Sequence, residues 1–312
     1  MISVVVATRN RHTLLERTLD ALVQQRCARE AYEVIVADNG SSDRTRTVIE
    51  EIARRAGGDR IRYLYVEEPG KSRAVNAALR LVSGDIVAFT DDDVRPDPGW
   101  IAQLIDTFSD PAVDFVAGRI LADWEAPPPR WMSPSLFGVL AIPDGGTRRL
   151  PIARGLNEHI MPIGANMAVR STVIERLGGL RLDLGKLEGT LRTGEDHEFF
   201  LRLLHDGRRG AYEPEAVVHH FVPGSRLRRD YFRRWLFQNG RDVARLERQY
   251  PPAARRLLAV PGYLWRDIAA AAAAGLRAAT IGDAPQRFAS SVRVLWFAGY
   301  AWETWSGRMR AS

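Results

Sequence analysis

The chain has 312 residues, of which 46% are hydrophobic and 26% charged, and this composition excludes disordered, collagen-like and coiled-coil proteins. The single cysteine, Cys27, excludes a disulfide framework, a multi-cysteine zinc site and a CxxC redox pair, and it fits a reducing, cytoplasmic compartment. The net charge of +6 is uneven, because residues 223–312 carry 16 arginines against six acidic residues, whereas residues 1–222 are net negative.

The first 120 residues alternate short β-branched runs with helical patterns. We predict strands at 2–7, 34–37, 61–66, 86–89 and 113–117. We predict helices at 11–25, 43–56, 71–81 and 97–108, the second capped by Asp43. A strand at the very start argues against a signal peptide. Strict alternation of strand and helix indicates a mainly parallel sheet with helices on both faces, which binds ligands beyond the carboxyl ends of its strands.

The pattern breaks at residues 123–160, a stretch rich in proline and glycine that we interpret as an irregular insertion near the site. The elements predicted next are a strand at 166–169, a helix at 171–177, a glycine-rich loop to Gly194, a helix at 195–204, a strand pair at 210–221, and helices beyond Pro223. We therefore expect a catalytic domain at 1–222, with halves at 1–122 and 160–222, and a basic helical region at 223–312.

The segment Thr90-Asp91-Asp92-Asp93, with three consecutive aspartates, directly follows the apolar run 86–89. Carboxylates at the end of a buried strand repel one another and are poorly solvated, so they usually require a cation. Asp91 and Asp93 can converge on one side of an extended chain. Oxygen ligands favour Mg²⁺ or Mn²⁺, held together with ligand phosphates. The pattern predicts a divalent-cation site; the alternative is a solvated turn before the helix near Asp97.

Two further polar segments follow predicted strands. Asp38 precedes a tight turn, and a carboxylate at this edge can accept hydrogen bonds from a nucleobase or ribose, although an ordinary turn is the alternative. The run at 70–72 is not a phosphate-binding P-loop, because Tyr65 stands where that motif requires glycine. Lys71 and Arg73 nevertheless lie at a helix start, where cations and free amides attract anions.

Acidic and imidazole groups recur in the second half of the sheet region. The segment Gly194–Glu198 opens a helix, and its acids either complement the helix dipole or present a general base at a pocket rim, over which the preceding loop can close. His219 and His220 end a predicted strand. Because neighbouring strand residues point to opposite faces, at most one is expected to be a metal ligand, and simple packing is the alternative.

Together, six segments resemble the family 2 glycosyltransferases, inverting enzymes of the GT-A fold, over residues 2–240. The segments are VVVATRNR, ADNGSSDRT, PGKSRAVNAAL, FTDDDVRPDPGWI, GANMAVR and GEDHEFFLRL. The resemblance implies an α/β fold of the GT-A class, with a Rossmann-like, mainly parallel central sheet and a C-terminal helical region. The chain differs from the family's processive synthases, which carry QxxRW, because Tyr231 replaces the glutamine before Arg234-Trp235. We therefore expect non-processive transfer.

The resemblance also implies roles for individual residues. Contacts to the nucleotide sugar are expected from Thr8, Arg9, Asp38, Arg73, Asp91 and Asp92. Asp93 and Asp91 are expected to bind a divalent cation, Mn²⁺ or Mg²⁺, with His219 as a further metal or diphosphate contact. Asp196 is expected to be the catalytic base, with Glu195 next in line. The acceptor is expected beside Gly164, Ala165 and Asn166.

The implied reaction moves a sugar from a UDP-, GDP- or dTDP-sugar to a hydroxyl of a glycan or lipid-linked acceptor, with inversion. Two other classes remain open. A nucleotidyltransferase also uses carboxylates and a metal, but the turn at 8–11 lacks the glycine expected of its phosphate loop. A non-catalytic module that binds polyanions or membranes would leave the carboxylates at 91–93 and 195–196 unexplained.

Residues 223–312 hold five of the eight tryptophans, and arginines combined with amphipathic rings are typical of proteins at anionic surfaces. The longest uncharged apolar runs, 268–276 and 294–302, are about half of the roughly 18 residues that span a bilayer. We expect a cytoplasmic protein, peripheral on the inner face of the cell membrane, without a nucleic-acid partner. The aromatic residues that could contribute are Trp265, Trp296, Phe297, Tyr300, Trp302 and Trp305, and a modest set of basic and aromatic residues suffices for reversible attachment. The alternative is that these rings pack the helices onto the catalytic domain.

Overall fold

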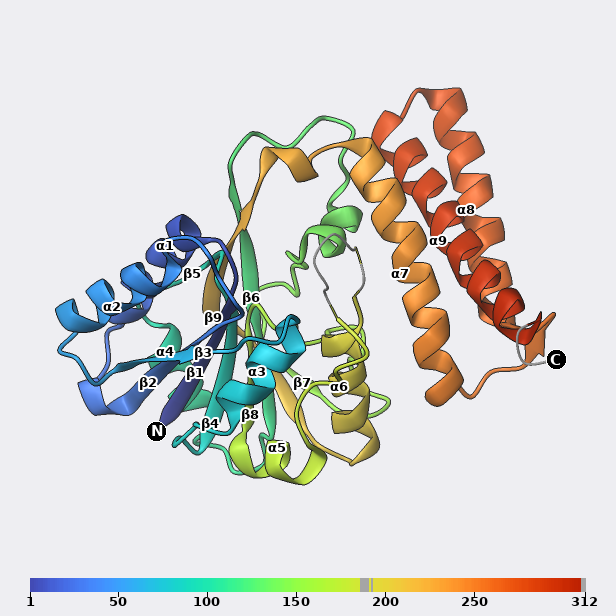
Figure 1. Cartoon of the computed structure of the whole chain (residues 1–312). Coiled ribbons are helices and arrows are strands. Elements are labelled where there is room, and N and C mark those ends of the chain that lie inside the picture. Colours follow the sequence, from blue (N-terminus) through green and yellow to red (C-terminus); the bar gives the residue numbers. More distant parts are fainter. Residues whose placement is uncertain (186–190, 192, 310–312) are drawn as a thin grey trace. The chain divides into compact units, whose positions relative to one another are not determined.

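The structure is a computed structural model that describes residues 1–185, 191 and 193–309 (Figure 1). Residues 186–190 and 192, part of the loop predicted before Gly194, lie outside this description. The chain divides into two compact units. The sheet unit contains Met1–Asp123, Ala141–Glu188 and Glu195–Phe221, and the helical unit contains Trp124–Leu140, Gly189–Gly194 and Val222–Ser312. The first part of the predicted insertion therefore groups with the C-terminal helices.

The sheet unit alternates strands and helices in its first half, as predicted. Its strands are β1 (Ile2–Thr8), β2 (Tyr32–Asp38), β3 (Ile61–Tyr65), β4 (Ile86–Asp91), β5 (Val94–Pro96), β6 (Phe115–Trp124), β7 (Leu150–Ile152), β8 (Met167–Arg170) and β9 (Gly210–Val222). Its α-helices are α1 (His12–Val23), α2 (Thr45–Arg55), α3 (Lys71–Leu79), α4 (Trp100–Thr107), α5 (Ser171–Leu177) and α6 (Glu195–His205). A short 3-10 helix lies at Arg29–Ala31 in the sheet unit, and the 3-10 helices at Pro134–Leu140 and Gly224–Arg226 belong to the helical unit.

The strands form one sheet in the order β3-β2-β1-β4-β8-β6-β9-β5, with β7 beside β9. Strands β3, β2, β1 and β4 pair in parallel, whereas β8 pairs antiparallel with β4 and β6, and β9 with β5 and β7. The register sets Thr8 opposite Asp38 and Ala7 opposite Asp91. The polar residues at the carboxyl ends of the parallel strands therefore meet at one edge of the sheet.

Helices cover both faces of the sheet (Figure 1). Val5, Ile35 and Val87 share one hydrophobic cluster with the apolar residues of α3, α5 and α6. On the other face, α1 packs against α2 and β5, and its leucines at positions 15, 19 and 22 are fully buried. Because strand residues alternate between faces, the β-branched runs fill both layers of the core. This frame holds the strand ends in fixed positions.

Two of the differences between the predicted and the observed elements concern β9 and α2. The strand pair predicted at 210–221 is wrong, because these residues form the single strand β9. Pro214 suggests a break, but it lies between the segment that pairs with β7 and the one that pairs with β5. Helix α2 begins at Thr45 rather than at Asp43. The Asp43 carboxylate accepts hydrogen bonds from the Thr45 backbone N–H at 3.0 Å and from its hydroxyl at 2.5 Å.

The helical unit consists mainly of α7 (Arg229–Gln249), α8 (Gly262–Ile281) and α9 (Ala284–Met309), with a short hairpin of β10 (Arg256–Leu257) and β11 (Val260–Pro261) before α8. Two glycines let α7 and α9 approach closely. A Cβ on Gly240 would lie 2.0 Å from the Trp296 carbonyl oxygen, and one on Gly299 would lie 2.0 Å from the Phe237 carbonyl oxygen. Larger residues at either position would force the helices apart.

Glu303 on α9 joins the two helices electrostatically. Its carboxylate accepts hydrogen bonds from Arg241 at 3.1 Å and from Arg245 and Arg248 at 3.0 Å. Burial on its own would raise the pKa of Glu303, but the hydrogen bonds and charges of these arginines lower it to about 2. One carboxylate thus balances three guanidinium groups of α7.

The six aromatic residues of the tail that the sequence marks for membrane contact do not all face solvent. Tyr300 is buried, and Trp265, Trp296 and Phe297 pack against the apolar cluster of the helical unit. Trp302 and Trp305 remain exposed, at 61% and 42%. The helices use four of the rings for their own core. Among the described residues, no helix has both the length and the apolar character needed to cross a membrane.

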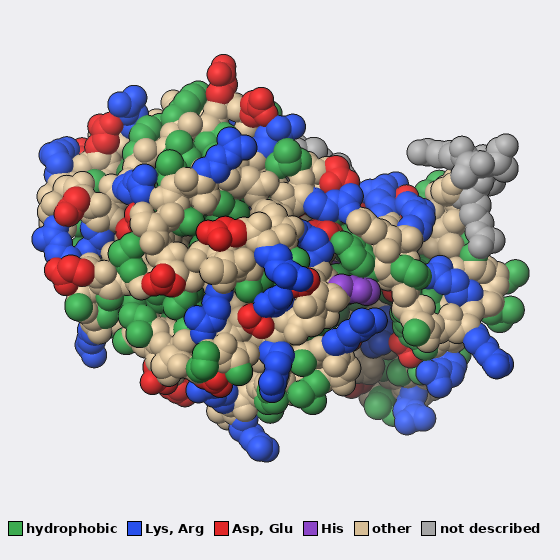
Figure 2. All heavy atoms as spheres, turned by 90° about the horizontal axis from the view of Figure 1, so that it is seen from below, with side chains coloured by type: hydrophobic (Ala, Val, Ile, Leu, Met, Phe, Trp, Pro, Cys, Tyr) green, Lys and Arg blue, Asp and Glu red, His purple; other side chains and the backbone are tan. Residues whose placement is uncertain are grey.

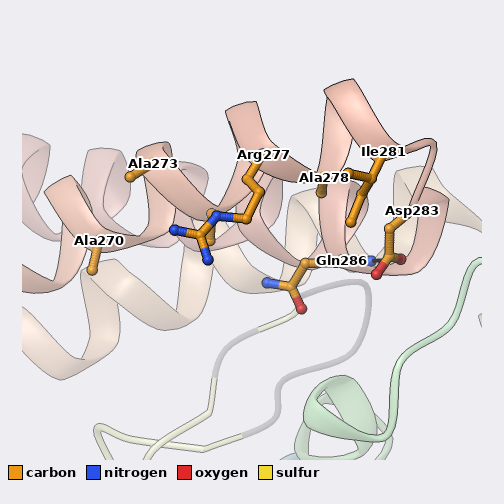
Figure 3. A pocket seen from close by; sticks show the side chains of 8 residues that line it. Ala270, Ala273, Arg277, Ala278, Ile281, Asp283 and Gln286 are labelled. Carbon is orange, nitrogen blue, oxygen red and sulfur yellow. Dashed lines mark hydrogen bonds between the residues drawn. The ribbon is translucent and has the colours of Figure 1, made fainter.

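A pocket of about 310 Å³ lies along α8 (Figure 3). Alanine methyl groups and Ile281 form most of its lining, together with Arg277, Asp283 and Gln286. Asp283 accepts a hydrogen bond from the backbone N–H of Gln286 at 2.9 Å, so it caps the start of α9. The pocket includes none of the candidate site residues.

Candidate active site

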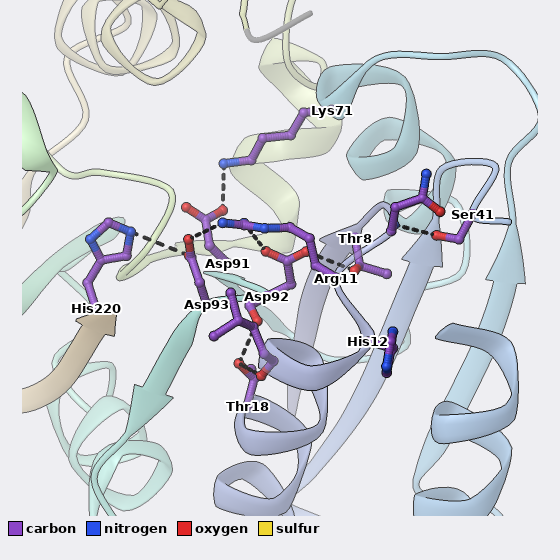
Figure 4. A network of polar contacts seen from close by, with 12 residues as sticks. Thr8, Arg11, His12, Thr18, Ser41, Lys71, Asp91, Asp92, Asp93 and His220 are labelled. Atoms are coloured by element: carbon purple, nitrogen blue, oxygen red, sulfur yellow. Dashed lines mark hydrogen bonds and ion pairs between the residues drawn. The ribbon is translucent and has the colours of Figure 1, made fainter. Parts of the chain in front are cut away.

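Asp92 and Asp93 are buried just beyond β4, and both form ion pairs with the Arg11 guanidinium (Figure 4). Arg11 donates to Asp92 at 2.6 Å and to Asp93 at 2.9 Å, and the Thr8 hydroxyl donates to Asp92 at 2.8 Å. Burial raises the pKa of Asp92 to about 6, because desolvation and the neighbouring Asp93 outweigh the effect of Arg11. Burial would lower the pKa of Arg11, but the two carboxylates raise it above its ordinary value. The sequence did not single out Arg11, although its place in the turn after β1 was a signal.

Asp91, Asp93 and His220 form a group able to hold a metal ion. One ligand atom from each lies within 4.8 Å of those from the other two, and His220 Nε2 is 3.4 Å from Asp93 Oδ1. Two carboxylates and an imidazole suit a divalent first-row ion such as Mn²⁺. The donor set therefore fits the cation predicted from the sequence, with nitrogen in addition to oxygen ligands.

The structure places His220, rather than His219, with the aspartates. In the pairing of β5 with β9, His220 lies opposite Val94 and His219 opposite Arg95, so the two rings point to opposite faces. His219 Nε2 lies 3.0 Å from Asp97 Oδ1. His219, the histidine expected to contact the metal, therefore lies apart from the group that could hold an ion, and that group contains His220 instead.

Two basic side chains at the start of α3, Lys71 and Arg73, have different surroundings. Lys71 Nζ donates to Asp91 Oδ1 at 2.5 Å and points toward the strand-end carboxylates (Figure 4). Burial would lower the pKa of Lys71, but Asp91 and the two acids of α6 raise it above its ordinary value. Arg73 donates to the exposed carboxylate of Glu68 at 2.6 Å. Of the two, Lys71 lies with the carboxylates.

Glu195 and Asp196 begin α6 and carry shifted pKa values. Burial and the neighbouring Asp196 raise the pKa of Glu195 to about 7, despite Lys71. Burial also raises the pKa of Asp196, against Lys71 and a 2.9 Å hydrogen bond from the Gly164 backbone N–H to Oδ2. A Cβ on Gly164 would lie 3.0 Å from Asp196 Oδ1, so glycine lets this carboxylate lie against the backbone. Raised carboxyl pKa values in a cleft are typical of groups that transfer protons.

The residues predicted to contact the nucleotide lie along the parallel edge of the sheet. Asp38 ends β2 and is buried, and it accepts hydrogen bonds from the Ser41 backbone N–H at 2.9 Å and from the Tyr63 hydroxyl at 3.0 Å. Burial and Asp38 raise the pKa of Tyr63 to about 12, so this hydroxyl stays a donor. Arg9 is half-buried directly after Thr8 at the end of β1.

The three residues predicted on the acceptor side differ from one another. Asn166 is buried, where its amide donates to two backbone carbonyl groups and accepts from the Trp100 indole at 2.8 Å. The Ala165 carbonyl accepts from the Thr90 hydroxyl at 3.0 Å. Gly164 contacts Asp196. Asn166 therefore holds the sheet together, and Gly164 lies beside the candidate base.

Comparison with known sequences agrees with this geometry. The family model for glycosyl transferase family 2 matches residues 3–178. Pre-mycofactocin glycosyltransferase of Mycobacterium tuberculosis is 30% identical over 219 residues, which make up 70% of this chain and 42% of that protein. Succinoglycan biosynthesis protein ExoM of Rhizobium meliloti is 29% identical over 247 residues, 78% of this chain and 74% of that protein. The matched region thus spans less than half of the first of these relatives.

Solved structures share the fold. Mannosyltransferase PcManGT from Pyrobaculum calidifontis, in complex with GDP-Man and Mn²⁺, superposes with a TM-score of 0.67 at 22% identity, over 98% of this chain and 87% of that one. S. aureus TarS 1–349 in complex with UDP-GlcNAc gives a TM-score of 0.56 at 15% identity, over 99% and 92%. The predicted GT-A fold class is confirmed. With a family match over more than half of its length, the chain belongs to glycosyl transferase family 2.

Proposed function

We propose that the chain transfers a sugar from a nucleotide-sugar donor to an acceptor hydroxyl, with inversion at the anomeric carbon. The observation that supports this proposal best is the position of Lys71. Its ammonium group donates a hydrogen bond to Asp91 of the candidate metal group and interacts with the charges of Glu195 and Asp196 on α6, so Lys71 links the two sets of acids. The metal group suits a diphosphate, and an acid of α6 suits the removal of a hydroxyl proton. Family membership and neighbours solved with GDP-Man or UDP-GlcNAc support it.

The donor is proposed to lie along the carboxyl edge of the parallel strands. Thr8, Arg9 and Asp38 would contact its nucleoside, because β1 and β2 end side by side. Asp91, Asp93 and His220 would hold the cation, which when bound offsets negative charge on the diphosphate. Arg73 at the exposed start of α3 would approach the donor only after releasing Glu68.

In the proposed step the acceptor oxygen forms a bond to the anomeric carbon while the bond from that carbon to the diphosphate oxygen breaks. The bonding electrons leave with the nucleoside diphosphate, and Asp196 takes the hydroxyl proton. The Gly164 backbone N–H donates a hydrogen bond to Asp196 Oδ2, so Oδ1 would be the oxygen that accepts the proton of the acceptor hydroxyl. Lys71 favours the ionised form of Asp196, the form that a base requires. A single displacement inverts the anomeric configuration.

We also propose a glycan or lipid-linked acceptor and a place at the inner face of the cell membrane. The arginine-rich composition of residues 223–312 supports this location. A lipid-linked acceptor would then be reached in two dimensions rather than from solution.

The test follows nucleoside diphosphate release from UDP-, GDP- and dTDP-sugars, with Mn²⁺ or with EDTA. We expect Mn²⁺-dependent release from one nucleotide class, loss of release in Asp93→Ala, and donor binding without turnover in Asp196→Asn. A nucleotidyltransferase would release pyrophosphate instead. Failure of every donor to bind or react with Mn²⁺ present would refute the proposed function.

A further inference from the structure

The exposed side of α9 combines apolar and basic residues. Up to residue 307, its exposed residues are Gln286, Arg287, Ser291, Arg293, Val294, Ala298, Trp302 and Trp305. The last four recur at spacings of four, four and three residues, which places them on one face of the helix. The acidic residue of α9, Glu303, is buried beneath three arginines. This face therefore presents apolar side chains without a carboxylate.

The tip of the β10–β11 hairpin extends this apolar face. Leu257 and Leu258 are 60% and 67% exposed. The Trp305 indole N–H donates to the Leu258 carbonyl at 2.9 Å, and the Trp265 indole N–H donates to the Leu257 carbonyl at 3.1 Å. Leu258 and Ala259 adopt positive φ values of 51° and 69°, which residues with a Cβ rarely adopt. The two indoles hold the tip in place with both leucine side chains in solvent.

We call this surface the α9 stripe: Val294, Ala298, Trp302, Trp305 and the tip Leu257–Leu258. Exposed arginines flank it, at 287 and 293 on α9 and at 255 and 256 in the hairpin. Figure 2 shows that Lys and Arg side chains predominate over Asp and Glu on the visible face of the helical unit. Arg293 lies 3.6 Å from Asp267, but the two side chains are 64% and 45% exposed, and such surface pairs contribute little.

We propose that the α9 stripe is the surface with which the chain lies on an anionic membrane. Val294 to Trp305 extends about 17 Å along the helix, roughly half of a ~30 Å hydrocarbon core, so α9 would lie in the plane of the interface. Tryptophan and arginine are the residues that suit this zone. A nucleic acid or acidic protein would pair with the arginines yet leave Leu257, Leu258 and Trp302 in water. The purpose of the contact, access to a lipid-linked acceptor, rests on the proposed function.

Flotation of the whole chain with vesicles tests the proposal. The vesicles contain phosphatidylcholine alone, or phosphatidylcholine and phosphatidylglycerol in equal parts. We expect the wild type to float with the anionic vesicles, and Trp302→Glu combined with Leu257→Glu to lower the bound fraction by more than about tenfold. Two matched controls, Ile105→Glu on α4 and Leu276→Glu on α8, also replace exposed apolar residues and are expected to float normally.

A second readout locates the contact. After Cys27→Ser, a cysteine placed by Ala298→Cys carries an environment-sensitive dye, and Ser109→Cys in the sheet unit serves as its reference. Only the dye at residue 298 is expected to shift to the blue on anionic vesicles. Two results would contradict membrane contact through the α9 stripe. The first is that the wild type floats with neither kind of vesicle. The second is that the double variant still floats with anionic vesicles and is released only by high salt. Nucleoside diphosphate release without vesicles should be unchanged in the variants, so a failure here is separable from a failure of sugar transfer.

Discussion

Glu195 in the sheet unit and Glu303 in the helical unit are equally hidden, at 7% and 8% exposure, yet their electrostatics are opposite. Burial and the neighbouring Asp196 raise the pKa of Glu195 to about 7. Burial acts in the same direction on Glu303, but three arginines lower its pKa to about 2. A buried acid among acids is poised to exchange a proton, whereas a buried acid among arginines fixes two helices. Glu195 therefore belongs to the candidate active site, and Glu303 belongs to a structural ion cluster.

The largest effect is expected from neutralising the acid beside Glu195. Asp196→Asn keeps the size of the side chain but cannot accept the acceptor proton, so kcat should fall by about 10² to 10⁴ while donor binding persists. Steady-state kinetics with the productive donor measures this. Glu195→Gln is the matched control, and if it lowers kcat more than Asp196→Asn does, the base is Glu195.

Glu303→Gln tests the ion cluster that joins α7 and α9. The three arginines then lose their carboxylate, and the chain should lose about 1 to 3 kcal/mol of stability in thermal or denaturant unfolding. The control is Glu50→Gln, whose pair with Arg46 is solvent-exposed and should contribute much less to stability. Equal losses in the two variants would show that the cluster is no more than a surface ion pair.

The two glutamates should also give opposite pH dependence. The folded pKa of Glu195 is raised, so its ionisation removes stability as the pH rises from 4.5 to about 7. The folded pKa of Glu303 is lowered, so its stabilisation is complete above 4.5 and disappears as the pH falls toward about 2. The Tm of Glu195→Gln should therefore rise relative to that of the wild type as the pH approaches neutrality. The Tm of Glu303→Gln should be lower than that of the wild type near neutral pH and equal to it in acid. Parallel curves for all three proteins would contradict both assignments.

A smaller effect on kcat is expected from changing Gly164, which packs against the Asp196 carboxylate. Gly164→Ala places a methyl group 3.0 Å from the Asp196 carboxylate, which must shift by a few tenths of an ångström. We expect kcat to fall by about three- to tenfold with little change in Tm. Gly99→Ala, whose added methyl would contact nothing within 4 Å, serves as control. A normal kcat for Gly164→Ala would show that this carboxylate tolerates displacement.

The edge of the parallel strands could be predicted from the sequence, because alternation of apolar strands and helices forces their carboxyl ends together. Thr8, Asp38 and Asp91 are the last residues of such strands and lie at one edge. The choice of His220 over His219 could not be predicted, since it depends on the register of β9 with β5, some 120 residues apart in the chain. Local patterns carry no information on that register.

The same limit applies to the tail. Composition correctly marks it as basic and rich in tryptophan, but composition cannot tell a ring that packs between helices from a ring in solvent. Tyr300 is buried because Gly240 and Gly299 bring α7 and α9 close together, a tertiary effect. The exposed pair, Trp302 and Trp305, is distinguished only in the folded helix.

Calorimetric titration of UDP, GDP and dTDP into the chain, with and without Mn²⁺, measures directly whether a metal ion holds the donor at this site. We expect one nucleoside diphosphate to bind only with Mn²⁺. Asp93→Ala and His220→Ala should each weaken that binding by more than about tenfold, whereas His219→Ala should leave it unchanged. Binding of equal strength in all four proteins with and without Mn²⁺, or no binding of any nucleoside diphosphate, would contradict a metal-assisted donor site at Asp91, Asp93 and His220.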